Sequence, residues 1–246
     1  MLAWIIGFCL LGSIGAICAA ALFLLFPENV RRFALPALIS YATGTLLAAA
    51  FLGMIPAALD RAPARPVMTT VLIGMVLFFV LEKLVLWRHS HDAPDEVQSS
   101  AGLLILFGDS LHNLVDGVVI AVAFMTSIPL GVATALAVIA HEIPQEVGEF
   151  AILLDAGYGR ARALALNALS ASMTVPGGIL AYFWLSGAEQ AVPYVLGVSA
   201  ASFIYIASAD LIPSLNRQQT AAGSVRQFVL LVAGIATIAV FYLGGH

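Results

Sequence analysis

The sequence predicts an all-α integral membrane protein with eight transmembrane helices. Of its 246 residues, 61% are hydrophobic and only 10% are charged, which is too little charge to cover a water-soluble domain of this size. Eight apolar windows are each long enough to cross a bilayer, which takes about 20 helical residues. Only short connectors separate them, so we expect residues 1–246 to form a single polytopic transmembrane domain.

The eight windows follow one another along the whole chain. They run over residues 2–26, 34–59, 67–87, 101–126, 129–155, 160–185, 191–214 and 223–243. The breaks between them are polar, charged or proline-containing: Pro27 with Arg31 and Arg32, then 60–66, 88–100, 127–131, 157–162, 186–193 and 216–226. Such residues end a helix or meet the membrane surface, so we expect turns and short loops there.

Net charge and cysteine content argue against other classes of protein. A net charge of -4 argues against a nucleic-acid partner, which would need positive charge; the lipid bilayer is the expected surrounding. Cys9 and Cys18 both lie in the first window, where we expect small packed side chains, and they form no zinc-finger spacing. No Lys or Arg precedes this window, so we expect it to stay as a helix.

Lys and Arg residues are divided unequally between the two sides of the predicted membrane topology. If the N-terminus lies outside the cytoplasm, the odd-numbered connectors and adjoining helix ends are cytoplasmic and hold all these residues except Arg61 and Arg65. Cytoplasmic loops carry the excess of positive charge in membrane proteins. We therefore expect both termini outside the cytoplasm and a multi-pass location in the inner (plasma) membrane.

Polar residues interrupt the fourth and fifth windows. Four of them share an arc of about 100° on the fourth helix: Asp109, His112, Asn113 and Asp116. Five more share one face of the fifth helix: His141, Glu142, Gln145, Glu146 and Glu149. The midpoints of both windows place their histidines at one depth, near the bilayer centre. Two adjacent antiparallel helices would turn these faces toward each other.

The acids on these faces have no positive partner within the membrane. No Lys or Arg occurs in residues 89–159, and Asp210 in the seventh window is equally isolated. A buried carboxylate must be paired, hydrogen-bonded, metal-bound or protonated. Two imidazoles among carboxylates favour a transition metal such as zinc, iron or manganese. A hydrogen-bonded network that joins the helices is the alternative.

Two motifs on these windows resemble signatures of a known family. His112–Gly117 reads HNLVDG and resembles the HNxxDG motif of the ZIP (Zrt-, Irt-like protein) family of divalent-metal transporters. His141–Phe150 reads HEIPQEVGEF and resembles the HEIPHEIGDF-type motif on the next helix of that family. The resemblance implies inverted three-helix repeats around a central pair, helices four and five. It also implies a metal centre between that pair, at His112, Asn113, Asp116, His141, Glu142 and Gln145.

The resemblance further implies uptake of a divalent transition metal into the cytoplasm, with zinc the first expectation and iron, manganese or cadmium the others. Gln145 stands where many relatives have a second histidine, and Val175 stands where relatives with two metals have a glutamate. We therefore expect one bound ion, while a second stays open. We expect a route toward the cytoplasm along Asp109, Glu146, Glu149 and Asp210.

Three further expectations concern smaller features. Relatives often carry a His-rich loop between helices three and four, and this loop offers a weak metal site at His89, His91 and Asp92. Ile55-Pro56 near the end of the second window echoes Ile212-Pro213 near the end of the seventh, as an inverted repeat would. A homodimer is left open.

Two other functions compete with metal transport. The sequence HEIPQ approaches the HExxH pattern of metalloproteases, but it lacks the second histidine that an intramembrane zinc hydrolase of that type would need. A proton-coupled carrier of an organic solute would use the acids as a proton relay. We predict a transporter without enzymatic activity.

Overall fold

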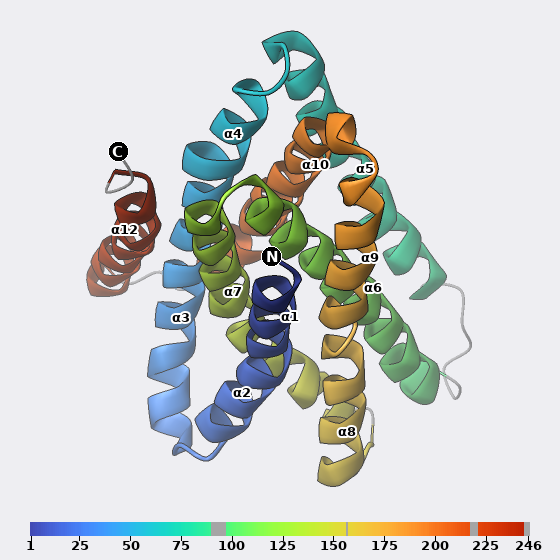
Figure 1. Cartoon of the computed structure of the whole chain (residues 1–246). Helices are drawn as coiled ribbons and strands as arrows, with labels where there is room; N and C mark the ends of the chain where they lie inside the picture. The colour runs from blue at the N-terminus through green and yellow to red at the C-terminus, as the bar shows by residue number, and fades with distance from the viewer. Residues whose placement is uncertain (90–96, 156, 217–220, 244–246) are drawn as a thin grey trace.

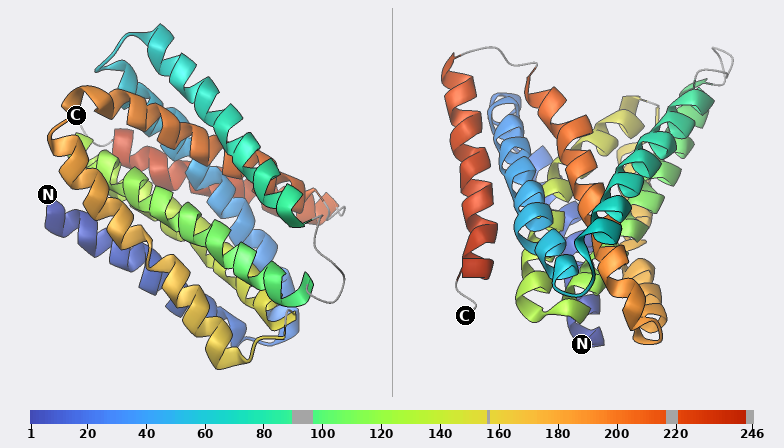
Figure 2. Two further views of the ribbon diagram at one scale, coloured as in Figure 1. Left: turned by 90° about the vertical axis from the view of Figure 1, so that its right-hand side faces the viewer. Right: turned by 90° about the horizontal axis from the view of Figure 1, so that it is seen from above.

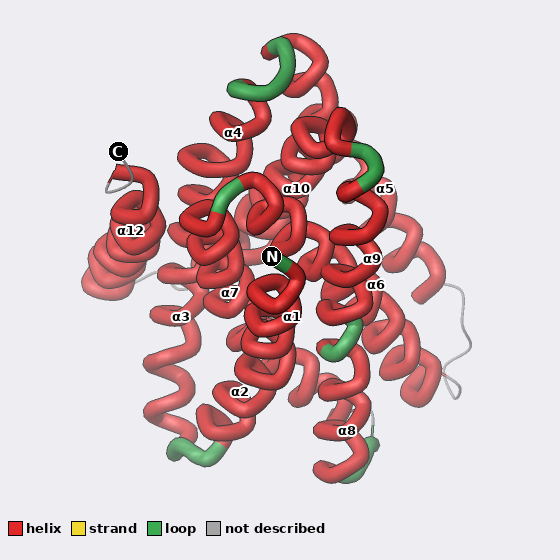
Figure 3. Tube along the Cα trace, viewed as in Figure 1, coloured by secondary structure: helices red, strands yellow, loops and turns green. Residues whose placement is uncertain are grey.

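The computed structural model describes residues 1–89, 97–155, 157–216 and 221–243, and every regular element in that part of the chain is a helix (Figure 1, Figure 3). Eight described segments are long and apolar enough to cross a membrane: Leu2–Leu24, Glu28–Leu59, Ala64–Leu84, Leu106–Thr126, Ile128–Leu154, Arg160–Ser186, Glu189–Leu215 and Gly223–Tyr242. The predicted all-α class and the number of spans are confirmed.

Two short π-helical turns interrupt the first four spans. A π-helical turn, Leu11–Gly15, separates α1 (Leu2–Leu10) from α2 (Ala16–Leu24). In the second span, a π-helical turn, Ala49–Met54, separates α3 (Glu28–Ala48) from α4 (Ile55–Leu59). The third and fourth spans lie within the long helices α5 (Ala64–His89) and α6 (Val97–Thr126).

The last four spans begin with α7 (Ile128–Asp155), which continues through Pro144. The sixth span consists of α8 (Arg160–Ala171) and α9 (Thr174–Ser186). The seventh consists of a 3-10 turn (Glu189–Ala191), α10 (Val192–Tyr205), a π-helical turn (Ile206–Leu211) and α11 (Ile212–Leu215). The eighth is α12 (Ala221–Leu243).

The sixth window was expected to be one helix over 160–185, and the structure divides it at Ser172 and Met173. Pro176 has no N–H group with which to bond the carbonyl four residues earlier, that of Ser172. The Ser172 carbonyl instead accepts from Val175 N at 3.1 Å, and the helix restarts at Thr174. The break therefore has a local cause in the sequence.

The second and seventh spans share a feature that sequence comparison alone would miss. In each, a π-helical turn of six residues comes directly before an Ile-Pro pair, Ile55-Pro56 in one and Ile212-Pro213 in the other. Such turns are rare, and they occur frequently at functional sites. Their matching positions support the inverted-repeat prediction, which stays a prediction.

Helices α6 and α7 form a pair in the middle of the bundle (Figure 1). Helix α6 packs on α7 and on α9, while α7 packs also on α2 and α3. Helix α12 lies at the edge of the bundle beside α3, and α5 lies beside α10 (Figure 2). The central pair is thereby surrounded by other spans.

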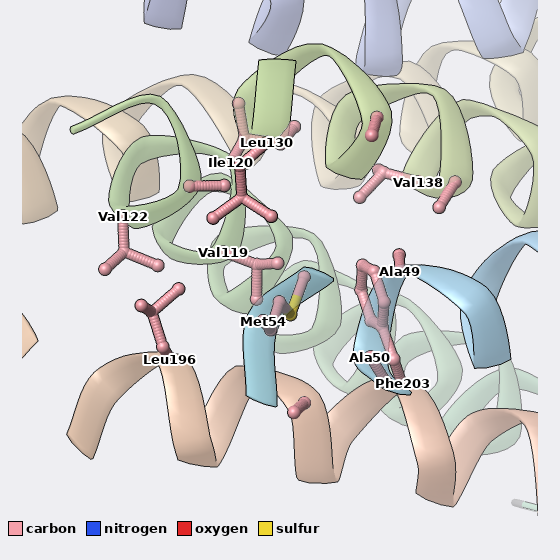
Figure 4. Packing of buried hydrophobic residues seen from close by; sticks show 14 of the residues in the cluster. Ala49, Ala50, Met54, Val119, Ile120, Val122, Leu130, Val138, Leu196 and Phe203 are labelled. Carbon is pink, nitrogen blue, oxygen red and sulfur yellow. The ribbon is translucent and has the colours of Figure 1, made fainter. Parts of the chain in front are cut away.

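One half of the central pair is a continuous apolar core, which we call the apolar half. It extends along α6 over Val119–Phe124 and along α7 from Leu130 to Val138, the ends that meet at Ser127. Met54 and the alanines of its π-helical turn pack against it from the second span, and Leu196 and Phe203 do so from α10 (Figure 4). The nine polar residues that the sequence places on facing sides of these helices lie beyond this core, on the side away from Ser127.

Glycines allow α6 and α9 to touch through their backbones. A Cβ atom added at Gly117 would overlap the carbonyl oxygen of Thr174, and one added at Gly177 would overlap the carbonyl oxygen of Leu114. Small residues allow this close approach in membrane helices. The contact brings the start of α9 against the polar face of α6.

Candidate metal site

Four side chains of α6 and α7 converge at the boundary of the apolar half. They are His112 and Asp116 from α6, and His141 and Glu142 from α7; each offers one ligand atom, and these atoms all lie within 4.8 Å of one another. His141, Asp116 and Glu142 are buried, and His112 is partly buried. We call these four residues the outer cluster.

The register of the two helices follows from the turn between them. Ser127 is the one residue that separates α6 from α7, and His112 and Glu142 each lie fifteen residues from it in the sequence. Antiparallel helices that start from a common turn bring residues at equal distances from it to the same level. The histidines were predicted to share one depth, and their Nε2 atoms lie 3.2 Å apart.

The distances within the outer cluster suit a tetrahedral ion. His141 Nε2 lies 3.3 Å from Asp116 Oδ2 and 3.4 Å from Glu142 Oε1. His112 Nε2 lies 3.4 Å from Glu142 Oε1 and 3.7 Å from Asp116 Oδ2. Tetrahedral zinc with bonds of about 2.0–2.1 Å separates its ligand atoms by about 3.3–3.4 Å. Little movement would be needed to enclose such an ion.

Hydrogen bonding at the back of His141 prepares it to bind a cation. Its Nδ1 lies 3.0 Å from the carbonyl oxygen of Ala137, one turn earlier. A carbonyl oxygen only accepts, so Nδ1 carries the hydrogen, and in the neutral form of the ring the Nε2 lone pair faces the cluster. The four carboxylate oxygens of Asp116 and Glu142 are buried and have no hydrogen-bond partner. A bound cation would satisfy them.

The other two predicted ligands, Asn113 and Gln145, take part in a neighbouring network. Asn113 Nδ2 donates to Asp109 Oδ1 at 2.9 Å. Gln145 Nε2 lies 3.2 Å from the same oxygen and 3.2 Å from Glu149 Oε1. Thr174 Oγ1 donates to Asn113 Oδ1 at 2.9 Å. Both amide nitrogens therefore donate hydrogen bonds to carboxylates. Because the Asn113 amide oxygen accepts from Thr174, only the Gln145 amide oxygen is left to bind an ion.

Comparison with known proteins identifies the family. Residues 88–242 match the family model described as ZIP Zinc transporter, and this is more than half of the chain. The chain belongs to the ZIP family. The family that the HNLVDG and HEIPQEVGEF motifs indicated is therefore confirmed.

Several relatives of this ZIP chain are named as zinc transporters. Zinc transporter ZIP13 of Pongo abelii is 32% identical over 222 residues, which are 84% of this chain and 66% of that protein. Zinc transporter foi of Drosophila melanogaster is 36% identical over 58% of this chain and 20% of its own length. Zinc transporter ZIP4 of Mus musculus is 39% identical over 46% of this chain and 17% of its own length. The chain thus spans less than two thirds of each relative, and none of these names is that of an enzyme, in agreement with our prediction.

The predicted route residues of the ZIP chain fall into two groups. Asp109, Glu146 and Glu149 are buried beside the outer cluster. Asp210 is exposed on the π-helical turn of the seventh span. Of the weak loop site, His91 and Asp92 lie outside the described residues, and His89 is described only as the backbone end of α5.

Sequence reasoning missed three residues that the ZIP fold brings to the site. Asn167 of α8 donates to Glu146 Oε2, Thr174 of α9 donates to Asn113, and the Phe203 ring lies edge-on to His141 at 6.0 Å. Asn167 and Thr174 are polar residues inside the sixth apolar window, and that is the signal that could have found them. Phe203 gives no such signal, because an aromatic residue is ordinary in a membrane helix.

Proposed function

We propose that this ZIP chain carries a divalent transition metal, zinc first, across a membrane into the cytoplasm, and that the outer cluster holds the ion on the way. One observation carries the proposal. Two imidazole nitrogens and two buried carboxylates from α6 and α7 lie within 4.8 Å of one another, and His141 Nε2 lies 3.2–3.4 Å from its three neighbours, close to the spacing of ligands around tetrahedral zinc. In the described part of the chain, no Lys or Arg forms an ion pair with these carboxylates.

The choice of zinc rests on the ligand set and on the relatives. Imidazole with carboxylate is a common ligand set for zinc, and it suits iron and manganese as well. The relatives of the chain are named as zinc transporters. Zinc is therefore the first substrate to test.

The direction of transport is supported by an asymmetry around the outer cluster. The apolar half closes the side toward Ser127, whereas the network of Asp109, Gln145 and Glu149 continues on the opposite side. The distribution of Lys and Arg assigns this opposite side to the cytoplasm. We propose that residues 1–246 form one domain in the plasma membrane with both termini outside. We further propose that the ion passes Asp109 and Glu149 as it leaves toward the cytoplasm.

Zinc uptake into liposomes tests the proposal. Purified protein is reconstituted with a zinc-sensitive dye inside the vesicles, and zinc is added outside. We expect dye fluorescence to rise with the wild-type protein, and no rise above empty vesicles with His112→Ala/His141→Ala, because half of the ligand set is removed.

The matched control is Asp60→Ala/Glu189→Ala, which removes two exposed acids distant in sequence from the cluster. It should transport zinc as the wild type does. Wild-type rates in the double histidine variant would refute the site, and an absence of transport by folded wild-type protein would refute the function.

A further inference from the structure

An open hollow lies where the turn between the first two spans meets α7. Helix α2 ends at Leu24 and α3 begins at Glu28, so this turn meets the membrane surface at one end of the bundle (Figure 1). The hollow has a volume of about 260 Å³, several times the roughly 30 Å³ that one water molecule occupies in the liquid. Its lining comes from α2, α3 and α7: Phe23, Glu28, Arg31, Arg32, Leu35 and Val147. It can therefore take a chemical group of several atoms.

Arg31 is the charged residue of this hollow that lacks a partner. Its Nε is buried and makes no hydrogen bond. Within the described part of the chain, its side chain forms no ion pair either. An excess of arginine on one side of a membrane protein is ordinary, but a buried donor that makes no hydrogen bond is costly. Arg31 therefore needs an acceptor that can enter the hollow from outside the chain.

The other two charged residues of the hollow neutralise each other. Arg32 Nη2 lies 2.6 Å from Glu28 Oε1, and both side chains are exposed. The lining thus has two positive side chains and one negative side chain, and the surplus charge belongs to Arg31. A partner with a single negative charge would balance it.

The rest of the lining is apolar. Phe23 and Val147 are buried in a small apolar cluster, and Leu35 packs against that cluster. An unpaired arginine beside apolar side chains suits a molecule that joins an anionic group to hydrocarbon. Phospholipids have this form, and basic pockets between membrane helices bind their anionic headgroups at the membrane surface.

We propose that this hollow binds one anionic phospholipid, whose phosphate accepts hydrogen bonds from Arg31 and whose glycerol and first acyl carbons contact Phe23, Leu35 and Val147. The planar guanidinium group can bind two phosphate oxygens at once. Phosphatidylcholine binds more weakly, because the ammonium group that it carries beside its phosphate is repelled by the arginine. The site needs no metal ion, so it is independent of the proposed function.

The bound lipid contacts the helix that carries His141 and Glu142. Val147 lies on α7 beyond these two residues, on the side away from Ser127. Helix α7 packs on α2 and α3, the two other helices that line the hollow. A ligand that binds only the folded protein stabilises it. The lipid therefore holds this part of α7 against α2 and α3.

Thermal unfolding of the purified protein in detergent, with lipid added, tests the site. The wild type should unfold at a higher temperature with phosphatidylglycerol than with an equal concentration of phosphatidylcholine. Arg31→Gln should weaken the binding of phosphatidylglycerol roughly tenfold or more, because a hydrogen bond between charged groups is lost. The dependence of the unfolding temperature on lipid concentration measures this binding.

Arg160→Gln is the matched control. It removes the same charge from an exposed position at the start of α8, at the same end of the bundle (Figure 1). Its response to phosphatidylglycerol should equal that of the wild type, because Arg160 does not line the hollow.

Photocrosslinking of the wild type locates the lipid without any substitution. Phosphatidylglycerol with a photoreactive group near its glycerol is mixed into the vesicles that hold the protein, and the labelled peptides are identified by mass spectrometry. We expect labelling at residues 23–35 and at Val147 to exceed that given by the matching phosphatidylcholine.

Several results would overturn the lipid site. Equal stabilisation by the two lipids would do so, as would an unchanged response in Arg31→Gln. Stabilisation by inorganic phosphate equal to that by phosphatidylglycerol would show a site for a free anion and no lipid. If Arg31→Gln does not fold, the crosslinks decide: equal labelling of the hollow by both lipids refutes the site. These measurements involve no zinc, so failure of the lipid site leaves the proposed function standing.

Discussion

Gln145 Nε2 lies 3.2 Å from Asp109 Oδ1 and 3.2 Å from Glu149 Oε1, so one amide group on α7 joins two buried carboxylates on two helices. Its position in the sequence, one turn after His141, made it a predicted metal ligand. In the structure its nitrogen is committed to the acids, and its oxygen alone is available to an ion. The residue thus joins Asp109 to Glu149 beside the outer cluster, and we expect substitutions there to affect both the cluster and these acids.

Gln145→His should tighten zinc binding, because an imidazole nitrogen is a stronger zinc ligand than an amide oxygen. It should also slow zinc uptake, since the ion is held longer and Asp109 and Glu149 lose a shared donor. Zinc affinity is measured by competition with a chelator, and uptake in liposomes. Gln190→His, on an exposed residue, is the control. Unchanged affinity would show that residue 145 does not reach the ion.

Gly117→Ala should lower the unfolding temperature, because the new methyl group would overlap the Thr174 carbonyl oxygen. Overpacking of this kind costs about 1–3 kcal/mol. Gly148→Ala is the matched control on α7: nothing lies within 4 Å of its added Cβ, and alanine stabilises a helix by roughly 0.5–1 kcal/mol relative to glycine. Thermal unfolding in detergent compares the two. Equal shifts would contradict the close contact of α6 and α9.

Phe203→Ala should destabilise the fold by about 3–5 kcal/mol, since it empties a fully buried site in the apolar half. The cavity would open beside His141, whose ring Phe203 contacts edge-on. Phe228→Ala removes the same ring from an exposed position on α12 and should cost far less. Denaturant or thermal unfolding measures both. A small effect at Phe203 would mean that its ring is not tightly packed against the apolar half.

Cysteine labelling should reveal the predicted sidedness. Asp60→Cys and Gly159→Cys place single thiols at exposed positions in the second and fifth connectors, in a background with Cys9→Ala and Cys18→Ala. A membrane-impermeant reagent added to intact cells should label residue 60 and spare residue 159. Labelling should reverse in inside-out vesicles. The opposite pattern would invert the topology and with it the proposed direction of transport.

Hydropathy and helical periodicity were sufficient to predict the spans and the facing histidines. Apolar length determines which segments can cross a bilayer, and the short turn at Ser127 brings α6 and α7 side by side in one register. Pro176 shows the limit of a window average: the sixth window is apolar throughout, yet the missing N–H group divides it into α8 and α9.

The contribution of α8 and α9 to the site could not be predicted in the same way. Periodicity assigns a residue to a face of its own helix, but it does not say which distant helix packs against that face. Asn167 reaches Glu146, and Thr174 reaches Asn113, across contacts between spans that are not joined by a tight turn. The hydrogen bonding of Gln145 to Asp109 and Glu149 likewise depends on the rotamer of its side chain and on its neighbours, which the sequence does not specify.

The single-residue turn at Ser127 has a consequence for how this protein can vary. The number of residues between Ser127 and each ligand sets where that ligand lies in the outer cluster. One inserted residue on either side of the turn would rotate two ligands by about 100° and shift them by about 1.5 Å along the helix axis. A substitution between residues 117 and 140 therefore keeps the register of the ligands, whereas an insertion or deletion there does not. Insertions and deletions are expected to accumulate elsewhere, in the connectors that position no ligand.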